Sequence, residues 1–418
     1  MEVESSLKIF GMEPEKGRWL FVVFGLLINL CIGSVYAWSV FTKPLSKLFM
    51  IGATESIMPY TISLAVFAIT MPLVGSALDK YGPRKIAVLG SFVVGIGWIL
   101  STLATNIWVL VITYGIIGGA GVGIVYNCPI GVAGRWFPDR RGLAVGATLF
   151  GFGLSAFITA PLANMFIERY GPITTFGYFG VIFIILITLF ALPLQFPPQG
   201  WRPSGWKPSA SATVQCCDRT RSEMVRTRSF WGIWLSYIIG TLAGLMAIGI
   251  ASPVGQEIFL LGAPAAAAFT GLFSTFNGVG RPLFGYVVDK ISFRITAIIT
   301  FGIIFVATLL LGTLGGPGTT IIYFIGFAAL CLSLGGWLAI APACTAAFFG
   351  TKYYGPNYGL MFTAYGIGAL IGSQMAGRMR DIVGSYSAVF YPVALLALIG
   401  GVIAYLFMKP PEEPVKSG

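Results

Sequence analysis

The sequence predicts an all-α membrane protein, with twelve transmembrane helices arranged as two pseudo-symmetric halves of six. Composition, the spacing of apolar segments and an internal repeat support this fold class. Of the 418 residues, 56% are hydrophobic and only 10% are charged, whereas about a quarter of the residues in a soluble domain are charged. Because a backbone in lipid must satisfy its own hydrogen bonds, we expect each span to be a continuous helix.

Twelve apolar segments reach the roughly 20 residues that a helix needs to cross about 30 Å of hydrocarbon. The predicted spans are residues 19–41, 55–78, 86–105, 107–134, 142–168, 172–196, 229–256, 264–288, 294–314, 318–347, 356–380 and 386–408. The residues before the first span include Glu2, Glu4, Glu13 and Glu15, which is unlike the basic start of a cleavable signal peptide. We therefore expect the first span to stay in the protein.

Basic residues gather on one predicted side of the membrane. The termini and the loops that follow even-numbered spans together hold 20 of the 26 Lys and Arg residues. Basic loops stay in the cytoplasm, so both termini are predicted to be cytoplasmic. Compact loops and the lack of a targeting segment favour a prokaryotic inner membrane. This placement also explains the net charge of +11 without a nucleic-acid partner.

A short pattern recurs in the two halves of the chain. "GSALDKYGPRK" begins at Gly75, and "GYVVDKISFR" begins 210 residues later at Gly285. A second set recurs at a separation of 213 residues: Gly142 with Gly355, Glu168 with Asp381, and Gly171 with Gly384. The Pro-, Ser- and Arg-rich segment between the copies is typical of a linker. We therefore predict a first half at 1–196, a cytoplasmic linker at 197–228 and a second half at 229–418.

The repeated loops carry Asp79 and Arg84 in the first half and Asp289 and Arg294 in the second. Oppositely charged side chains at helix ends form charge-assisted bonds and interact with helix dipoles. We therefore predict that these residues act as cytoplasmic clasps, which break when the halves rock. The alternative is that they belong to ordinary basic loops.

Several kinds of chemistry are excluded by residue type. The chain contains no histidine, which removes His-based acid–base catalysis and most zinc sites, and we expect neither a metal nor a cofactor. The adjacent Cys216 and Cys217 lie in the basic linker without further candidate ligands, so a redox or metal role is not expected. An enzyme would need a clustered nucleophile and base, and a channel would need charged rings or a filter sequence. Neither pattern is present, and a non-transporting sensor remains an alternative.

One charge, Arg281, interrupts the predicted span 264–288. A charge at bilayer depth is costly and normally marks a ligand or a transport pathway. Because the middle of every predicted span lacks Asp and Glu, an anionic ligand is favoured over a structural ion pair. A guanidinium can hold a carboxylate through two parallel hydrogen bonds. Asn277 lies one turn earlier on the same helix face and is predicted to orient the guanidinium or the ligand.

The loop "GSALDKYGPRK" resembles the signature of the major facilitator superfamily. "AGVGIVYNCPIGVAGRWFPDRRGLAVG" and "FNGVGRPLFGYVVDK" further resemble the oxalate/formate antiporter family and related bacterial monocarboxylate transporters, as do "GSVYAW" and "NYGLMF". The string from Arg135 to Gly142 is the most specific of these matches, and the resemblance covers nearly the whole chain. It implies the major facilitator fold, a substrate site between the halves, and a carboxylate-binding role for Arg281.

The same resemblance bears on the substrate. In the oxalate exchangers of this family, a lysine of helix eleven accompanies the arginine, and Tyr365 stands at that position here. A single fixed positive charge suits a monocarboxylate such as lactate, pyruvate, acetate or formate better than the dianion oxalate. Tyr365 can donate one hydrogen bond to the ligand or can simply pack. Asn29, Tyr36 and Tyr126 are further polar groups in apolar spans, expected either to face the substrate or to pack between helices.

The predicted function is secondary active transport of a small, lactate- or pyruvate-like monocarboxylate by alternating access, with proton symport. Glu257, near the outer end of the seventh span, is the candidate proton carrier if burial raises its pKa; an exposed rim residue is the alternative. The proton can also travel on the substrate carboxyl, and an oxalate/formate-type anion exchanger needs no protein proton site. We expect a monomer whose partners are the substrate, a proton and the lipid bilayer.

Overall fold

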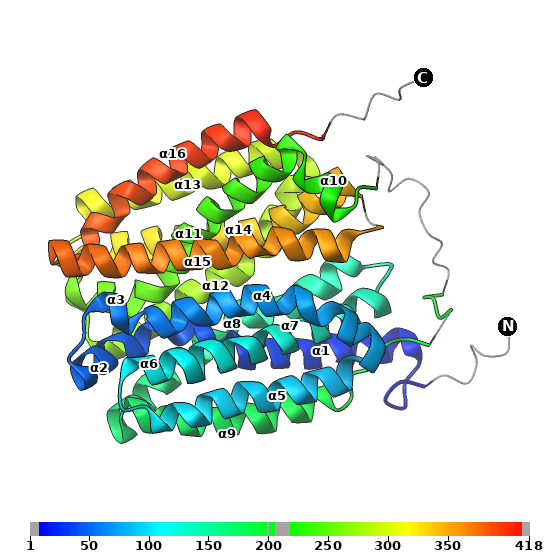
Figure 1. The fold of residues 1–418 in the computed structure, drawn as a ribbon, viewed down its shortest axis with the longest axis horizontal. Helices are drawn as coiled ribbons and strands as arrows, with labels where there is room; N and C mark the ends of the chain where they lie inside the picture. Colours follow the sequence, from blue (N-terminus) through cyan, green and yellow to red (C-terminus); the bar gives the residue numbers. More distant parts are fainter. Residues whose placement is uncertain (1–7, 199, 205–217, 351, 412–418) are drawn as a thin grey trace.

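The computed structural model describes residues 8–198, 200–204, 218–350 and 352–411. Long helices run side by side between two ends of the molecule (Figure 1). The start of α1 (Pro14–Ile32) and the end of α16 (Phe390–Phe407) lie at one end, which we call the termini end. The helices α2 (Ser39–Phe49) and α3 (Ala53–Ser56) lie at the opposite end, called the α3 end.

We call α1–α9 the first half and α11–α16 the second half. The other helical segments of the first half are η1 (Gly33–Ala37), α4 (Met58–Tyr81), α5 (Pro83–Leu100), η2 (Ser101–Leu103), α6 (Ile107–Leu110), η3 (Val111–Gly118), α7 (Gly119–Trp136), α8 (Arg141–Tyr170) and α9 (Pro172–Ala191). After α10 (Arg221–Val225), the second half contains α11 (Arg228–Glu257), α12 (Ala263–Lys290), α13 (Phe293–Leu314), α14 (Thr320–Phe349), α15 (Tyr354–Val383) and η4 (Tyr386–Val389). Much of the predicted linker, including Cys216 and Cys217, lies outside the described residues, and the boundaries of the two halves stay a prediction.

The predicted fold class is confirmed, because each of the twelve predicted spans coincides with a long helical segment. In the described part of the chain, ten segments are long and apolar enough to cross a membrane. α12 and α15 are not among them, since both carry buried polar residues, which include Asn277, Arg281, Asn357 and Ser373. α12 packs along α8 and α15 packs along α4. The two least apolar spans of the second half therefore line its contact with the first half.

The first and fourth spans stay helical but change their helix type. The first span changes from α-helix to the tighter 3₁₀ form over η1, and the fourth widens to a π-helix over η3. At the start of η1, a Cβ on Gly33 would lie 2.6 Å from the Phe152 carbonyl oxygen of α8, so only glycine permits this close approach. Such irregular turns often occur at functional positions.

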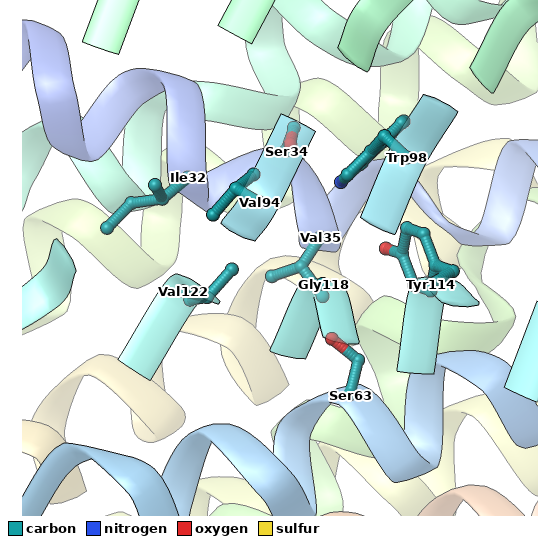
Figure 2. Close-up of a pocket in the computed structure, with 9 residues that line it drawn as sticks. All are labelled: Ile32, Ser34, Val35, Ser63, Val94, Trp98, Tyr114, Gly118 and Val122. Carbon is teal, nitrogen blue, oxygen red and sulfur yellow. The ribbon is translucent and has the colours of Figure 1, made fainter. Parts of the chain in front are cut away.

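The two irregular segments lie against each other (Figure 2). Ser34 and Val35 of η1 meet Tyr114 and Gly118 of η3 around a small void that has no space for a water molecule. The Trp38 and Tyr114 rings close this region, with centroids 4.5 Å apart. The void is therefore packing inside the first half and not a binding pocket.

Small residues set the distance between the halves. A Cβ on Gly271 would lie 2.7 Å from the Ala156 carbonyl oxygen, and one on Gly366 would lie 2.8 Å from the Ala68 Cβ. Membrane helices approach closely where such residues face each other.

Gly171 and Gly384, which match in the sequence repeat, both end a long helix with a left-handed φ, of 80° and 82°.

Candidate functional site

Arg281 lies on α12 with its side chain buried, at 6% exposure. Its Nη1 donates to the Leu149 carbonyl oxygen of α8 at 3.3 Å, and its Nη2 donates to Asn277 Oδ1 at 3.4 Å. Both bonds are longer than the usual 2.7–3.2 Å. Among the described residues, Nε has no hydrogen-bond partner and no carboxylate forms an ion pair with Arg281. The site is therefore a buried cation whose donors are only weakly satisfied.

Close packing of α12 holds this arginine in the interior. Gly278 lies against Gly153 of α8, and Gly280 lies against the Leu332 carbonyl group of α14. Ser274 donates a hydrogen bond to the Gly153 carbonyl oxygen across the same interface. α12 is thereby wedged between a helix of the first half and a helix of the second, which excludes lipid from the face that carries Arg281.

Asn277 lies beside Arg281, as their four-residue separation implies. Its Oδ1 accepts the Arg281 bond, whereas its Nδ2 has no partner in the described structure. The side chain is completely buried. An unsatisfied buried donor costs about 1–3 kcal/mol, so the pair Arg281–Asn277 retains capacity for an acceptor that is not part of the protein.

Aromatic side chains from both halves surround this pair. The Tyr36 and Tyr365 hydroxyl oxygens are 3.1 Å apart, which joins η1 to α15 by a hydrogen bond. The Tyr126 ring packs edge-on against Phe152 at 5.5 Å, and the Arg281 guanidinium lies 6.0 Å from the Phe152 ring centroid. The Arg281 charge acts electrostatically on both Tyr36 and Tyr126. The structure thus brings Arg281, Asn277, Tyr126, Tyr36 and Tyr365 into one region.

Asn29 and Glu257 form no hydrogen bond with Arg281 in the described structure. Asn29 is buried in α1 and donates to the Gly25 carbonyl oxygen of its own helix at 2.9 Å, while its Oδ1 has no partner among the described residues. Glu257 lies at the α3 end, where its carboxylate is 2.8 Å from Arg380 Nε and 3.6 Å from Lys43 Nζ. Glu257 thus forms one ion pair within the second half and one across to the first, and its role as proton carrier stays a prediction.

Two of the four predicted clasp residues, Asp79 and Arg294, form polar contacts within their own halves. Asp79 forms an ion pair with Arg135 of α7 instead of with Arg84. Arg294 donates to the Tyr405 carbonyl oxygen of α16 at 3.4 Å. In the described residues, Asp289 has no ion pair. The clasp role of Asp79, Arg84, Asp289 and Arg294 therefore stays a prediction.

The sequence analysis missed the polar contacts that join the halves at the α3 end. Asp381 of α15 accepts hydrogen bonds from the Ala53 and Thr54 backbone amides at 2.8 and 2.9 Å, and so caps α3 of the other half. Its recurrence in the repeat opposite Glu168 was a signal for this position. The ion pair between Lys43 and Glu257 had no such signal, because the two residues are far apart in sequence.

Two helical halves that meet along paired helices, with a buried cation at their interface, define a multi-pass membrane transporter. Residues 19–373 match the sequence profile of the Major Facilitator Superfamily. The chain belongs to this superfamily. The predicted resemblance is thereby confirmed.

Named relatives and solved structures agree with this assignment. The oxalate:formate antiporter of Oxalobacter formigenes is 30% identical over 96% of this chain and 93% of its own length. Monocarboxylate transporter 3 of Rattus norvegicus is 26% identical over 94% of this chain and 80% of its own length. A bacterial homologue of the human lysosomal transporter Spinster, solved in an inward-facing and occupied conformation, superposes with a TM-score of 0.71 at 14% identity, covering 97% of this chain and 100% of that one.

Proposed function

We propose that this protein carries a small monocarboxylate, such as lactate or pyruvate, across a prokaryotic inner membrane by alternating access and with proton symport. The observation that carries the proposal is Arg281, a buried cation with weak hydrogen bonds and no carboxylate partner among the described residues. An anionic substrate supplies the missing charge. The similarity to a monocarboxylate transporter supports the same class of substrate.

The number of fixed charges in the site supports a monoanion. Tyr365, Tyr36 and Tyr126 contribute neutral phenols, and Arg281 contributes the positive charge. A carboxylate that binds Arg281 neutralises it, which lowers the cost of enclosing the site in a medium of low polarity. The halves then rock and expose the site at the other end. With both termini in the cytoplasm, the α3 end faces the outside.

Two routes for the proton are part of this proposal. The proton is carried either by Glu257, which forms ion pairs with Arg380 and Lys43, or by the substrate carboxyl itself. An exchanger of the oxalate/formate type is the second candidate, favoured by the 30% identity to an oxalate:formate antiporter.

The test is uptake of labelled lactate by proteoliposomes, with and without an inward proton gradient. Unlabelled oxalate, formate, acetate and pyruvate serve as competitors. We expect Arg281→Gln to reduce uptake roughly a hundredfold, since a buried charge that binds its partner directly is typically worth several kcal/mol. Arg169→Gln, at the far end of α8, is the matched control and should transport normally.

Two outcomes separate the candidates. Gradient-driven uptake that oxalate does not inhibit supports proton symport of a monocarboxylate. Strong inhibition by oxalate, or uptake that requires an internal anion and no proton gradient, identifies an exchanger instead. Full activity of Arg281→Gln would remove the basis of the proposal.

A further inference from the structure

Tyr237 of α11 is a buried phenol that the site described above leaves out. Its side chain is fully buried, and its hydroxyl has no hydrogen-bond partner in the described structure. The Tyr358 phenol is near it but does not form a hydrogen bond of normal geometry with it. An unsatisfied hydroxyl in a helix interface is costly, and such groups in native proteins call for an explanation.

The ring of Tyr237 is fixed by packing, so the hydroxyl has a defined position. It stacks on Trp337 of α14 with ring centroids 6.2 Å apart and an angle of 26° between the planes. Trp337 in turn lies 5.2 Å from Phe301. On its other side, Trp337 fills the space left by Gly240, where any side chain would collide with its indole nitrogen.

Tyr237 lies at the same depth in the membrane as Arg281. It is nine residues from the start of α11, and Arg281 is nine residues from the end of the antiparallel α12. At 1.5 Å per residue, both lie about 14 Å from the termini end of their helices. The two helices are in contact, and the charge of Arg281 acts electrostatically on the Tyr237 hydroxyl.

We propose that the Tyr237 hydroxyl binds an oxygen on the α-carbon of the substrate, and so selects 2-hydroxy and 2-oxo monocarboxylates over plain ones. This inference rests on the proposed monocarboxylate function. Arg281 binds the carboxylate group, which leaves the Tyr237 hydroxyl and the Asn277 amide to meet a neighbouring oxygen. A phenol both donates and accepts a hydrogen bond, so it can bind the hydroxyl of lactate or the keto oxygen of pyruvate.

The test compares lactate with propionate, which has the same carbon chain without the hydroxyl group. We expect wild-type protein to show a lower KM for lactate than for propionate. Tyr237→Phe should raise the KM for lactate and for pyruvate roughly three- to tenfold, the usual worth of one hydrogen bond. The KM for propionate should stay unchanged, because propionate has no oxygen on its α-carbon for Tyr237 to bind.

Tyr323→Phe is the matched control. The Tyr323 hydroxyl is equally buried in the second half but donates to the Ala251 carbonyl oxygen at 2.7 Å. We expect this variant to change lactate and propionate transport by the same factor. An equal effect of Tyr237→Phe on both substrates would show that Tyr237 has only a structural role and would overturn the inference.

Wild-type protein provides a second measurement that does not depend on folding of the variant. Lactate, pyruvate and propionate are compared by the shift that each produces in the melting temperature of the purified protein. Larger shifts with lactate and pyruvate support the inference, and equal shifts with all three contradict it. Failure of wild-type protein to transport or bind any of the three would instead overturn the proposed function.

Discussion

The two ends of the interface between the halves differ in where their charged groups find partners. At the α3 end, Lys43 of the first half pairs with Glu257 of the second, and Asp381 of the second half caps α3 of the first. At the termini end, Arg135 pairs with Asp79, and Arg18 pairs with Asp139, all within the first half. Among the described residues of the two halves, the hydrogen bond between the halves that lies nearest to the termini end joins Arg281 to Leu149.

Packing along α8 and α12 is also closer towards the α3 end than towards the termini end. Gly153 and Gly271, towards the α3 end, leave no space for a side chain. Gly146 and Gly285, towards the termini end, have no neighbouring atom within 4 Å of an added Cβ. The comparison teaches that electrostatic bonds and close packing together hold the halves at the α3 end. The charge pairs of the termini end stabilise each half separately, and the halves still meet there between α15 and α4, where a Cβ on Gly359 would lie 2.5 Å from the Pro72 Cβ.

The ion pairs at the two ends also differ in solvent exposure. The Lys43 and Glu257 side chains are 28% and 26% exposed, whereas those of Asp79 and Arg135 are 63% and 46% exposed. Water screens the second pair more strongly, and exposed pairs contribute about 0–1 kcal/mol. The buried pair Arg18–Asp139 is stronger, and hydrogen bonding to Arg18 lowers the pKa of the Asp139 carboxyl. This bond fixes α1 to the loop before α8 within one half.

Locking the α3 end gives the largest expected effect. The Ser39 and Thr270 hydroxyl oxygens are 3.4 Å apart across the interface, so Ser39→Cys with Thr270→Cys places two sulfur atoms close to bonding distance. In a background with Cys216→Ser and Cys217→Ser, oxidation should reduce transport about tenfold or more, and a reductant should restore it. Each single cysteine variant serves as a control. Unchanged transport after complete cross-linking would show that the α3 end need not open.

Removing the charge of Glu257 should have an intermediate effect. Glu257→Gln leaves Lys43 and Arg380 without their anion, so the α3 end should open more often. We expect the rate at which a maleimide labels Thr270→Cys in lipid nanodiscs to rise about fivefold, corresponding to roughly 1 kcal/mol for a partly buried pair. Asp79→Asn, which breaks an ion pair inside one half, should leave this rate unchanged. An equal increase with Asp79→Asn would break the comparison between the two ends.

Weakening the cap of α3 should have the smallest effect. Asp381→Asn retains one acceptor oxygen for the Ala53 or Thr54 amide but loses the charge. The same labelling rate should rise about two- to threefold, in keeping with the usual worth of a helix cap. Its counterpart in the repeat, Glu168, bonds to Asn164 of its own helix at 2.7 Å. Glu168→Gln should therefore have no effect, and an effect equal to that of Asp381→Asn would contradict the role assigned to the cap.

The fold and the main site residue, Arg281, were predictable because their signals lie in short, continuous stretches of the sequence. Apolar length identified the twelve spans, and helical periodicity placed Asn277 beside Arg281. The change to a 3₁₀ helix at η1 was not predictable, because it accompanies the close approach of Phe152 to Gly33, and these residues are distant in the chain. The partners of Asp79 and Glu257 were missed for the same reason: nearby charges, such as Arg84, are visible in sequence, whereas Arg135 and Lys43 become neighbours only through packing.

The bond from Arg281 to Leu149 makes ligand binding and separation of the halves a linked equilibrium. Arg281 belongs to the second half and Leu149 to the first, so an anion that takes the N–H group bonded to Leu149 releases a bond between the halves. Linkage is reciprocal: if separation of the halves raises the affinity for the anion by some factor, the anion favours separation by the same factor. Through this one hydrogen bond, ligand binding and separation of the halves share a single coupling free energy.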